Sequence, residues 1–326
     1  MTKLVRFMKT GALGLGITLA SLSLPAHADA YPDKPITIVV GFPPGGASDV
    51  ITRVIGTQMQ VLLKQPVIVK NQGGVNGNMA SEAFAKATPD GYTLMLGTIA
   101  NAINGSMLKN VRHDAEKAFT PIVEFQASPS VLVVNPQLPV KTLQELIVLA
   151  KQKPGMTYAS NGAGSSPHLA AEMLKQRAGI DLLHVPYKGA APAMMDVIAG
   201  HVQVAFLTAL SAIPNMQDGS LRPLAVAASR RLPLIPDVPT MKEAGLADFE
   251  VESWNGLFAP AGTPRDIVLL LNKTVNEILQ TPEVRKRIED MAGFPVGGTP
   301  EQFSALLHAE TLKWAEVIRK GNIQPD

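Results

Sequence analysis

The feature that most constrains this chain is a short strand that passes through a glycine-rich turn directly into a helix, over residues 36–52. The run Ile36 to Val40 is apolar and largely β-branched, which predicts a buried strand. The loop Phe42 to Gly46 carries two prolines and two adjacent glycines, and a helical pattern begins at Ala47. The first N–H groups of a helix lack intrahelical partners and lie at the positive end of its dipole. This stretch therefore suits a phosphate, a carboxylate or a turn without a ligand, and it does not decide between them.

The same order of strand, loop and helix continues along the chain. Further strands are predicted at 66–70, 92–97, 120–126, 131–135, 156–159, 182–185, 202–206 and 224–228, and helices at 47–63, 78–87, 142–153, 166–178, 192–199, 264–279, 282–291 and 300–320. Thr142 and Glu145 have the spacing of a capping box at the start of one helix. The alternation predicts an α/β fold with parallel strands, helices on the sheet faces and ligands at the strand ends.

Residues 1–28 have the three parts of a secretory signal peptide. Three basic residues precede an apolar run at 11–24, and the small-residue site Ala26-His27-Ala28 follows. The apolar run is short for a membrane span, so we expect cleavage after Ala28 in preference to an uncleaved anchor. No cysteine stands at the cleavage site to carry a lipid. We therefore expect the mature chain to be soluble in the periplasm.

Composition argues against several classes of function. Cleavage of the predicted signal peptide removes three basic residues and no acidic residue, so the mature chain has 26 Lys and Arg against 27 Asp and Glu. Such a nearly neutral surface gives no support for binding of nucleic acid or anionic lipid. The chain has no cysteine, and its six histidines show no metal-binding spacing. We therefore expect no disulfide, no metal and no cofactor.

The length and the order of elements predict two domains. About 298 residues remain after cleavage, more than one ordinary core holds. The alternation of strands and helices begins again after residues 131–135, where we expect the chain to pass from the first domain to the second. We expect the aromatic segment at 254–260 to lead the chain back to the first domain. The expected domains are residues 29–131 together with 252–326, and residues 132–251. Two crossings between two α/β domains predict a two-strand hinge with the ligand cleft between the domains.

Two loops at helix starts are candidate halves of an anion site. The loop at 42–46 lacks the Gly-Lys-Ser/Thr sequence of a phosphate-binding loop, which weakens the phosphate interpretation. The second loop, Ser160 to His168, places Ser165 or Ser166 at an N-cap and Pro167 at the first helical position. It is a good cap in itself, and its N–H and hydroxyl groups also suit an anion from the other domain.

No catalytic group stands out in the sequence. The second loop lacks the G-x-S-x-G of a nucleophile elbow, so a hydrolase with Ser165 or Ser166 as nucleophile and His168 as base is a distant alternative. His168 is interpreted first as a packed or surface histidine and second as a ligand contact. Asp49 is interpreted as a helix cap, and Tyr187 as a hydrogen-bonding group at the rim of the cleft.

Short motifs stand along the mature chain in a specific order and spacing. They are Y-P-D-K-P-I-T-I-V-V at 31–40, F-P-P-G-G-A-S-D at 42–49, P-D-G-Y-T-L at 89–94, L-V-V-N-P at 132–136, Y-A-S-N-G at 158–162, H-V-P-Y-K-G at 184–189, P-D-V-P-T at 236–240 and L-F-A-P-A-G-T-P at 257–264. Through these motifs the chain resembles the Bug/TctC family, the extracytoplasmic solute-binding proteins of tripartite tricarboxylate transporters. The resemblance covers essentially the whole mature chain.

The resemblance implies a two-lobed type II periplasmic binding protein fold, monomeric, that closes on a small carboxylate. In the family, main-chain groups, hydroxyls and bridging waters hold the ligand. Carried over by position, the ligand-binding residues are Phe42, Pro44, Gly45, Gly46, Ala47, Ser48, Thr98 and Asn101 in the first lobe, and Asn161, Gly162, Ser165, Ser166, His168 and Tyr187 in the second. Two positions depart from the family. Leu207 stands where Asp often follows Phe206, so a polar group is missing at the second-lobe rim, and Gly41 replaces the usual Pro.

The leading hypothesis is a periplasmic solute-binding protein, not an enzyme, that hands its ligand to integral-membrane transporter subunits. The ligand classes that suit it are dicarboxylates, tricarboxylates, acidic amino acids and aromatic acids. A ligand-sensing receptor of the same fold that acts on a sensor kinase is an alternative that the sequence does not separate from transport.

Overall fold

The first strands and helix form where the sequence pattern predicts them. The computed structural model describes residues 31–324, so the predicted signal peptide lies outside the described residues. β1 (Ile36–Val40) buries alternate side chains, and α1 (Ala47–Leu63) follows from Gly46, which is its N-cap. β2 (Val67–Asn71) and β3 (Thr93–Thr98) pair parallel to β1 on its two sides.

Most of the remaining elements also lie close to their predicted positions. The other strands are β4 (Phe119–Val134), β5 (Met156–Ser160), β6 (Leu182–Pro186), β7 (Val204–Thr208), β8 (Arg222–Val226), β9 (Glu252–Pro260) and β10 (Phe294–Pro295). The other helices are α2 (Asn78–Phe84), α3 (Ile99–Met107), α4 (Ala115–Ala118), α5 (Leu143–Gln152), α6 (Ser166–Ala178), α7 (Ala190–Ile198), α8 (Ala209–Gln217), α9 (Arg265–Gln280), α10 (Pro282–Asp290) and α11 (Pro300–Lys320). The sequence pattern does not predict α3, α4 or α8. None of the helices in residues 31–324 combines the length and the apolar character that a membrane span requires.

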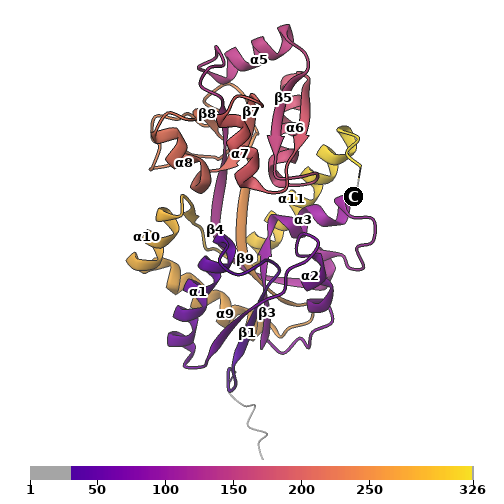
Figure 1. Cartoon of the computed structure of the whole chain (residues 1–326). Helices are drawn as coiled ribbons and strands as arrows, with labels where there is room; N and C mark the ends of the chain where they lie inside the picture. The colour runs from indigo at the N-terminus through magenta and orange to yellow at the C-terminus, as the bar shows by residue number, and fades with distance from the viewer. Residues whose placement is uncertain (1–30, 325–326) are drawn as a thin grey trace, which may run out of the picture. The chain divides into compact units, whose positions relative to one another are not determined.

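One continuous sheet connects the described strands and has a parallel set at each end. The order is β2-β1-β3-β9-β4-β7-β5-β6, with β8 and β10 paired to β4 beside this path. The sets β2-β1-β3 and β7-β5-β6 are each parallel, whereas β4 and β9 between them run antiparallel to their neighbours (Figure 1). We call the first set with its helices lobe 1, and the second set with α5 to α8 lobe 2. The predicted parallel strands are confirmed in each lobe, whereas the predicted strands of β4 and β8 pair antiparallel, and the sequence pattern does not predict β9 as a strand.

β4 is the strand that passes from lobe 1 to lobe 2. The sequence pattern predicts two strands here, but the structure has a single strand of 16 residues. As far as Pro129 it pairs with β9, and from Ser130 onward it pairs with β7 and β8. Proline donates no main-chain hydrogen bond, and Pro129 is tolerated because it lies where the strand changes partners. Since β9 runs beside β4, two antiparallel strands connect the lobes (Figure 1).

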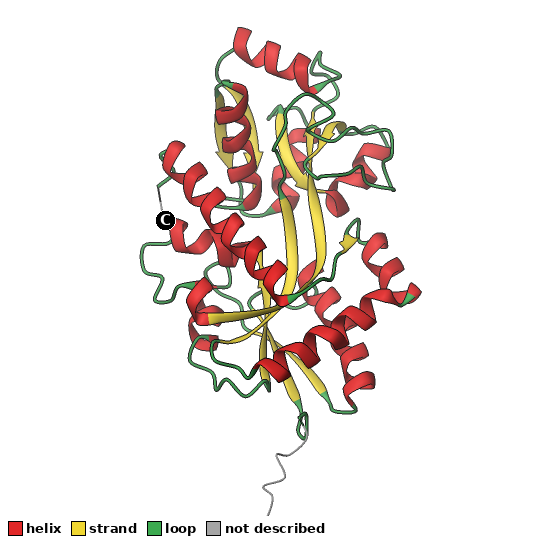
Figure 2. Cartoon of the chain, turned by 180° about the vertical axis from the view of Figure 1, so that it is seen from behind, coloured by secondary structure: helices red, strands yellow, loops and turns green. Residues whose placement is uncertain are grey.

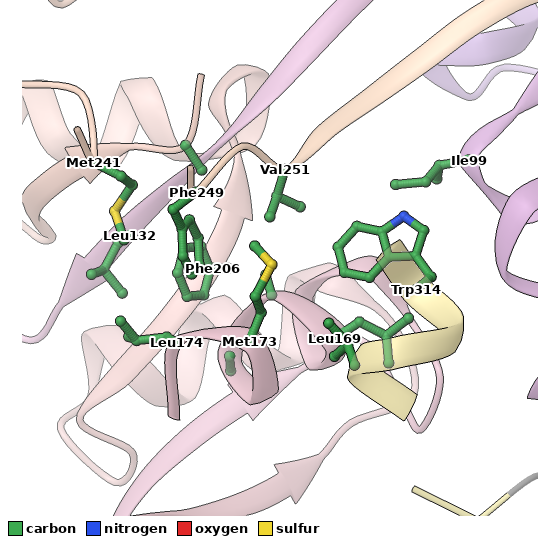
Figure 3. Packing of buried hydrophobic residues seen from close by; sticks show 14 of the residues in the cluster. Ile99, Leu132, Leu169, Met173, Leu174, Phe206, Met241, Phe249, Val251 and Trp314 are labelled. Atoms are coloured by element: carbon green, nitrogen blue, oxygen red, sulfur yellow. The ribbon is translucent and has the colours of Figure 1, made fainter. Parts of the chain in front are cut away.

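α11 makes a further connection between the lobes. It packs against α3 and β4, and it also reaches α6 of lobe 2 (Figure 2). The buried Trp314 of α11 lies among Ile99 of α3, Leu169 of α6 and Val251, within one hydrophobic cluster (Figure 3). The C-terminal helix that the sequence assigns to the first domain therefore packs on both lobes.

Candidate ligand-binding site

A pocket of about 450 Å³ lies where the strand-end loops of the two lobes meet. Its wall consists of Gly41, Phe42, Pro43, Gly74, Val75, Asn76, Gly77, Asn104, Met107 and Leu108 from lobe 1, and Asn161, Ala163, Gly164 and Ser165 from lobe 2. None of these described residues carries a charged side chain. The polar groups of the wall are main-chain amides, asparagine amides and a serine hydroxyl, which suit a small molecule held by hydrogen bonds.

The predicted first-lobe loop reaches this pocket with part of its length. Phe42 lines the pocket, whereas residues 44–47 are exposed beside it and do not belong to its wall. Among the described residues, the N–H groups of Gly46 and Ala47 have no protein acceptor. The hydroxyl of Ser48 accepts a hydrogen bond from Asn255 Nδ2 at 3.1 Å. The first turn of α1 therefore offers N–H groups toward solvent at the pocket edge.

Asp49 occupies the inner part of that first turn. Its Oδ2 accepts hydrogen bonds from Arg53 Nε at 3.0 Å and from Gly45 N at 2.9 Å, and its Oδ1 accepts one from Asn71 Nδ2 at 2.8 Å. The bond from Arg53 does most to lower the pKa of Asp49, which falls to about 2. Asp49 is an acidic residue of the first turn, as the sequence indicates, but the N-cap is Gly46, and the N–H that Asp49 accepts is that of Gly45 just before it. The turn therefore holds an internal anion on its inner side, and its N–H groups without protein acceptors are those of Gly46 and Ala47 on the outer side.

The predicted second-lobe loop is held without any charge. Ser165 is the N-cap of α6, and its hydroxyl donates to the Gly162 carbonyl at 2.7 Å. Gly162 N donates to Ser160 Oγ at 3.2 Å, and Gly164 N donates to His168 Nδ1 at 2.9 Å. The N–H groups of both glycines therefore bond back into lobe 2.

Several polar groups of this loop lack partners among the described residues. The N–H groups of Asn161 and Ala163 have no protein acceptor, and both residues line the pocket. Asn161 Oδ1 and Ser166 Oγ are buried without a hydrogen-bond partner. Ser166 does not line the pocket, whereas Asn161 does. Buried polar atoms are costly to leave unpaired, so the unpaired Asn161 Oδ1 indicates a bond to a ligand donor or to water.

His168 lies behind the loop and does not line the pocket. It is 6% exposed and stacks on His184 with the ring centroids 3.9 Å apart. Burial, followed by the effects of His184 and Lys175, lowers the pKa of His168 to about 3. The ring is therefore neutral, and its Nδ1 accepts a hydrogen bond. Within the described structure neither Ser165 nor Ser166 bonds to His168, so the serine–histidine pair of the hydrolase alternative does not form.

Three of the predicted ligand-binding residues do not line the pocket and form hydrogen bonds within the protein: Thr98, Asn101 and Tyr187. Thr98 and Asn101 line a small cavity beside the pocket. They begin α3 where a strand-end loop was the expectation, and Thr98 N donates to Asn101 Oδ1 at 2.9 Å in a capping box. Tyr187 donates its hydroxyl to Asp196 Oδ2 at 2.5 Å and stays outside the pocket wall.

One lining segment that sequence reasoning missed is the loop Gly74–Gly77. Its four residues have φ values of 141°, 45°, 51° and 77° in order. The left-handed region is unusual for a β-branched residue such as Val75, and strain of this kind is concentrated at binding sites. Asn76 Nδ2 donates to Asn104 Oδ1 at 3.0 Å, and Asn104 Nδ2 donates to the Asn76 carbonyl at 3.1 Å. The Gly/Asn composition was the available signal, but it does not show which wall the loop forms.

The structure corrects the expectation for Leu207 and explains Gly41. Leu207 is 2% exposed in the hydrophobic core of lobe 2 and does not stand at the rim. The polar group at this strand end is Thr208, whose Oγ1 lies 2.9 Å from Ser211 Oγ. A side chain on Gly41 would lie 3.0 Å from Gly77 Cα, so Gly41 lets the two loops of lobe 1 approach closely.

Two parallel strand sets, joined by long antiparallel strands and meeting at an uncharged polar pocket, define a two-lobed periplasmic binding protein fold. The family described as the tripartite tricarboxylate transporter family receptor, TctC, has a model that matches residues 51–323. The chain belongs to this family, which consists of solute-binding proteins and not of enzymes. The resemblance that the sequence motifs indicate is confirmed.

Individual relatives cover almost the whole chain. The chain is 36% identical to the protein BugT of Bordetella pertussis over 311 aligned residues. The alignment covers 94% of this chain and 95% of BugT. The solved structure of R. palustris Rpa4515 with adipate has a TM-score of 0.77 and 32% identity, and covers 91% of this chain and 100% of Rpa4515. MatC of Rhodopseudomonas palustris with bound malate has a TM-score of 0.73 and 32% identity, and covers 88% of this chain and 100% of MatC.

Proposed function

We propose that this chain is a periplasmic receptor that captures a small dicarboxylate and delivers it to the membrane subunits of a tripartite transporter. The observation that carries the proposal is the uncharged pocket whose lobe 2 wall presents N–H groups without protein acceptors. Family membership supports the role of receptor, and relatives with adipate and with malate support the ligand class. The signal-peptide pattern supports export and cleavage after Ala28.

The pocket needs no arginine to bind a carboxylate with micromolar affinity. A helix N-terminus contributes about 0.3–2 kcal/mol toward an anion, depending on burial. Each net hydrogen bond contributes about 1 kcal/mol, and more when it is charge-assisted. Two helix starts and several N–H donors together approach the roughly −8 kcal/mol that a micromolar dissociation constant requires.

We assign one carboxylate of the ligand to the lobe 2 loop, where Asn161 and Ser165 line the pocket. The other carboxylate meets Phe42 and the outer N–H groups of the first turn of α1. Those N–H groups lie outside the pocket wall, so contact requires the lobes to close. β4 and β9 are the hinge in this proposal, between a domain of residues 29–131 and 252–326 and a domain of residues 132–251.

A thermal-shift screen with a matched uncharged ligand tests the proposal. Adipate, malate, citrate, glutamate and benzoate are compared with adipamide, which has the length of adipate but no charge. A ligand at 100 times its dissociation constant should stabilise the protein by about 2.7 kcal/mol. We expect a dicarboxylate, adipate, malate or glutamate, to raise the melting temperature most and adipamide to leave it unchanged. If none of these dicarboxylates stabilises the protein, or if adipamide acts as strongly as adipate, the proposal is wrong.

A further inference from the structure

A stack of aromatic rings lies behind the lobe 2 loop, and ligand contact does not explain it. His168 of α6 lies flat on His184 of β6, with centroids 3.9 Å apart and planes 6° apart. Tyr158 of β5 lies beside this pair, 4.9 Å from His184 and 6.3 Å from His168 between centroids, with its ring plane close to parallel to both. The rings come from three different elements. The stack therefore joins α6, β5 and β6 directly beneath the loop at residues 160–165.

Both imidazoles are hydrogen-bonded to the loop. His168 Nδ1 accepts the N–H of Gly164 at 2.9 Å. His184 Nε2 lies 2.6 Å from Ser160 Oγ. The same hydroxyl donates to the Gly162 carbonyl at 3.1 Å and accepts from the Gly162 N–H at 3.2 Å. One ring therefore fixes the beginning of the loop, and the other ring fixes its end.

These bonds occupy alternate N–H groups of the loop. The N–H groups of Gly162 and Gly164 bond inward, whereas those of Asn161 and Ala163 have no acceptor among the described residues and belong to the pocket wall. Both glycines have positive φ, 127° and 69°. Glycine reaches this backbone conformation easily but also leaves it easily. A loop of this composition needs external bonds to keep its outward N–H groups in one direction.

We propose that His168 and His184 are positioning residues that hold the loop at 160–165 so that the N–H groups of Asn161 and Ala163 face the ligand. The inference rests on the proposed function for the nature of the ligand as a carboxylate. His168 performs this role only as a neutral ring, because a protonated Nδ1 cannot accept the Gly164 N–H.

The groups that face the stack keep it neutral. Tyr158 on β5 donates to Glu172 on α6 at 2.7 Å, and Lys175 on α6 donates to the same oxygen at 2.8 Å. Burial lowers the pKa of His168 and of His184; Lys175 lowers both further, and Glu172 opposes this at His184. The Glu172 carboxylate is already paired with Lys175, so neither imidazole has a free carboxylate to charge it. The stack acts through geometry and not through charge.

A pair of variants at His168 tests the positioning role without a ligand. His168→Asn places an amide oxygen where Nδ1 lies and cannot titrate, and His168→Leu retains bulk but has no acceptor. Hydrogen exchange at Gly164 and its neighbours is measured in the wild type and in both variants. We expect exchange about tenfold faster in His168→Leu and close to wild type in His168→Asn. Equal exchange in all three proteins would overturn the inference.

A nitrogen NMR spectrum of the wild type gives the same test without mutation. We expect His168 to keep a bare Nδ1 and a protonated Nε2 between about pH 8 and pH 5. If His168 titrates near the ordinary pKa of histidine, or if its Nδ1 is protonated, the inference is overturned. This result needs no variant, so it holds even if a variant fails to fold.

Calorimetric titration with adipate, and with malate in parallel, separates this inference from the proposed function. We expect His168→Leu to bind about tenfold more weakly and His168→Asn to bind nearly as the wild type. The wild-type affinity should be flat from about pH 8 to pH 6, whereas a cationic His168 that touches the ligand would strengthen binding as the pH falls. Wild type that binds no carboxylate overturns the proposed function, while exchange and NMR still decide the role of the stack.

Discussion

Replacement of Gly164 by alanine tests how closely the two lobes meet at the pocket. Gly164 has a φ of 69°, and an added Cβ would lie 2.7 Å from Met107 Cε and 3.1 Å from its Cγ. The left-handed backbone costs a non-glycine residue about 1–2 kcal/mol. Met107 must also turn away or the loop must shift, and both residues belong to the pocket wall. We expect the free energy of unfolding to fall by about 1–2 kcal/mol and the affinity for adipate to fall about tenfold.

Gly179→Ala is the matched control for the backbone cost. Gly179 is the C-cap of the same helix, has a φ of 61°, and would have no atom within 4 Å of an added Cβ. Urea denaturation and calorimetric titration are carried out on both variants. We expect similar losses of unfolding free energy, with the loss of affinity confined to Gly164→Ala. Equal adipate affinities for the two variants would refute the contact between the lobe 2 loop and Met107 as a determinant of binding.

Three further substitutions test separate parts of the structure. Gly46 has an ordinary φ of −73°, and an added Cβ would meet only the Pro43 carbonyl oxygen, at an ordinary contact distance of 3.9 Å, so Gly46→Val should fold normally. Its side chain would cover the outer N–H groups of α1, and calorimetry should show the affinity for adipate reduced at least about tenfold. Unchanged affinity would argue against that half of the site. The lowered pKa of Asp49, about 2, means that its charge stabilises the folded state fully above pH 3.8 and that this stability is lost as the pH falls toward 2. Asp49→Asn should therefore lose about 1–2 kcal/mol at neutral pH and flatten the acid limb of the unfolding curve. An unaltered acid limb would show that the charge of Asp49 does not stabilise the folded state. Burial, with Glu252 and Glu310, raises the pKa of Glu124 from 4.5 to about 8, so the folded state binds this proton more tightly and stability falls as the pH rises through that range. Glu124→Gln should be the more stable protein at about pH 9, by on the order of 2 kcal/mol, and thermal melts with no such gain would contradict the assignment.

The sequence predicts the fold well where neighbouring residues determine the structure. Thr142 and Glu145 form the predicted capping box, with Glu145 N donating to Thr142 Oγ1 at 3.1 Å. Two of the three closing helices begin at a proline, which suits the first helical turn because the missing N–H has no intrahelical partner there. These elements need no distant contact to be recognised.

Prediction fails where a distant partner decides the structure. The sequence pattern predicts separate strands at 120–126 and 131–135, but pairing to β9 as far as Pro129 and to β7 and β8 after it keeps β4 continuous. α3 contains Asn101, Asn104 and Gly105, which favour helices weakly, and it is stabilised by packing against α11 and β9. Tertiary contacts therefore override local preference in both places.

The candidate site also has residues that the local sequence predicts and residues whose position depends on distant contacts. Phe42, Asn161 and Ser165 line the pocket, and each belongs to a loop that composition marks directly after a strand. His168 belongs to the same marked loop, but its position is set by stacking on His184, which the sequence does not show. The strained Val75 loop likewise forms a wall that composition alone does not locate.

A crystal structure with the most strongly stabilising carboxylate tests the proposed site most directly. We expect carboxylate oxygens within hydrogen-bond distance of the N–H groups of Asn161 or Ala163 on one side and of Gly46 or Ala47 on the other. A ligand held by an arginine side chain, or one seated in the separate pocket of about 330 Å³ that includes His113, would contradict the binding site described here.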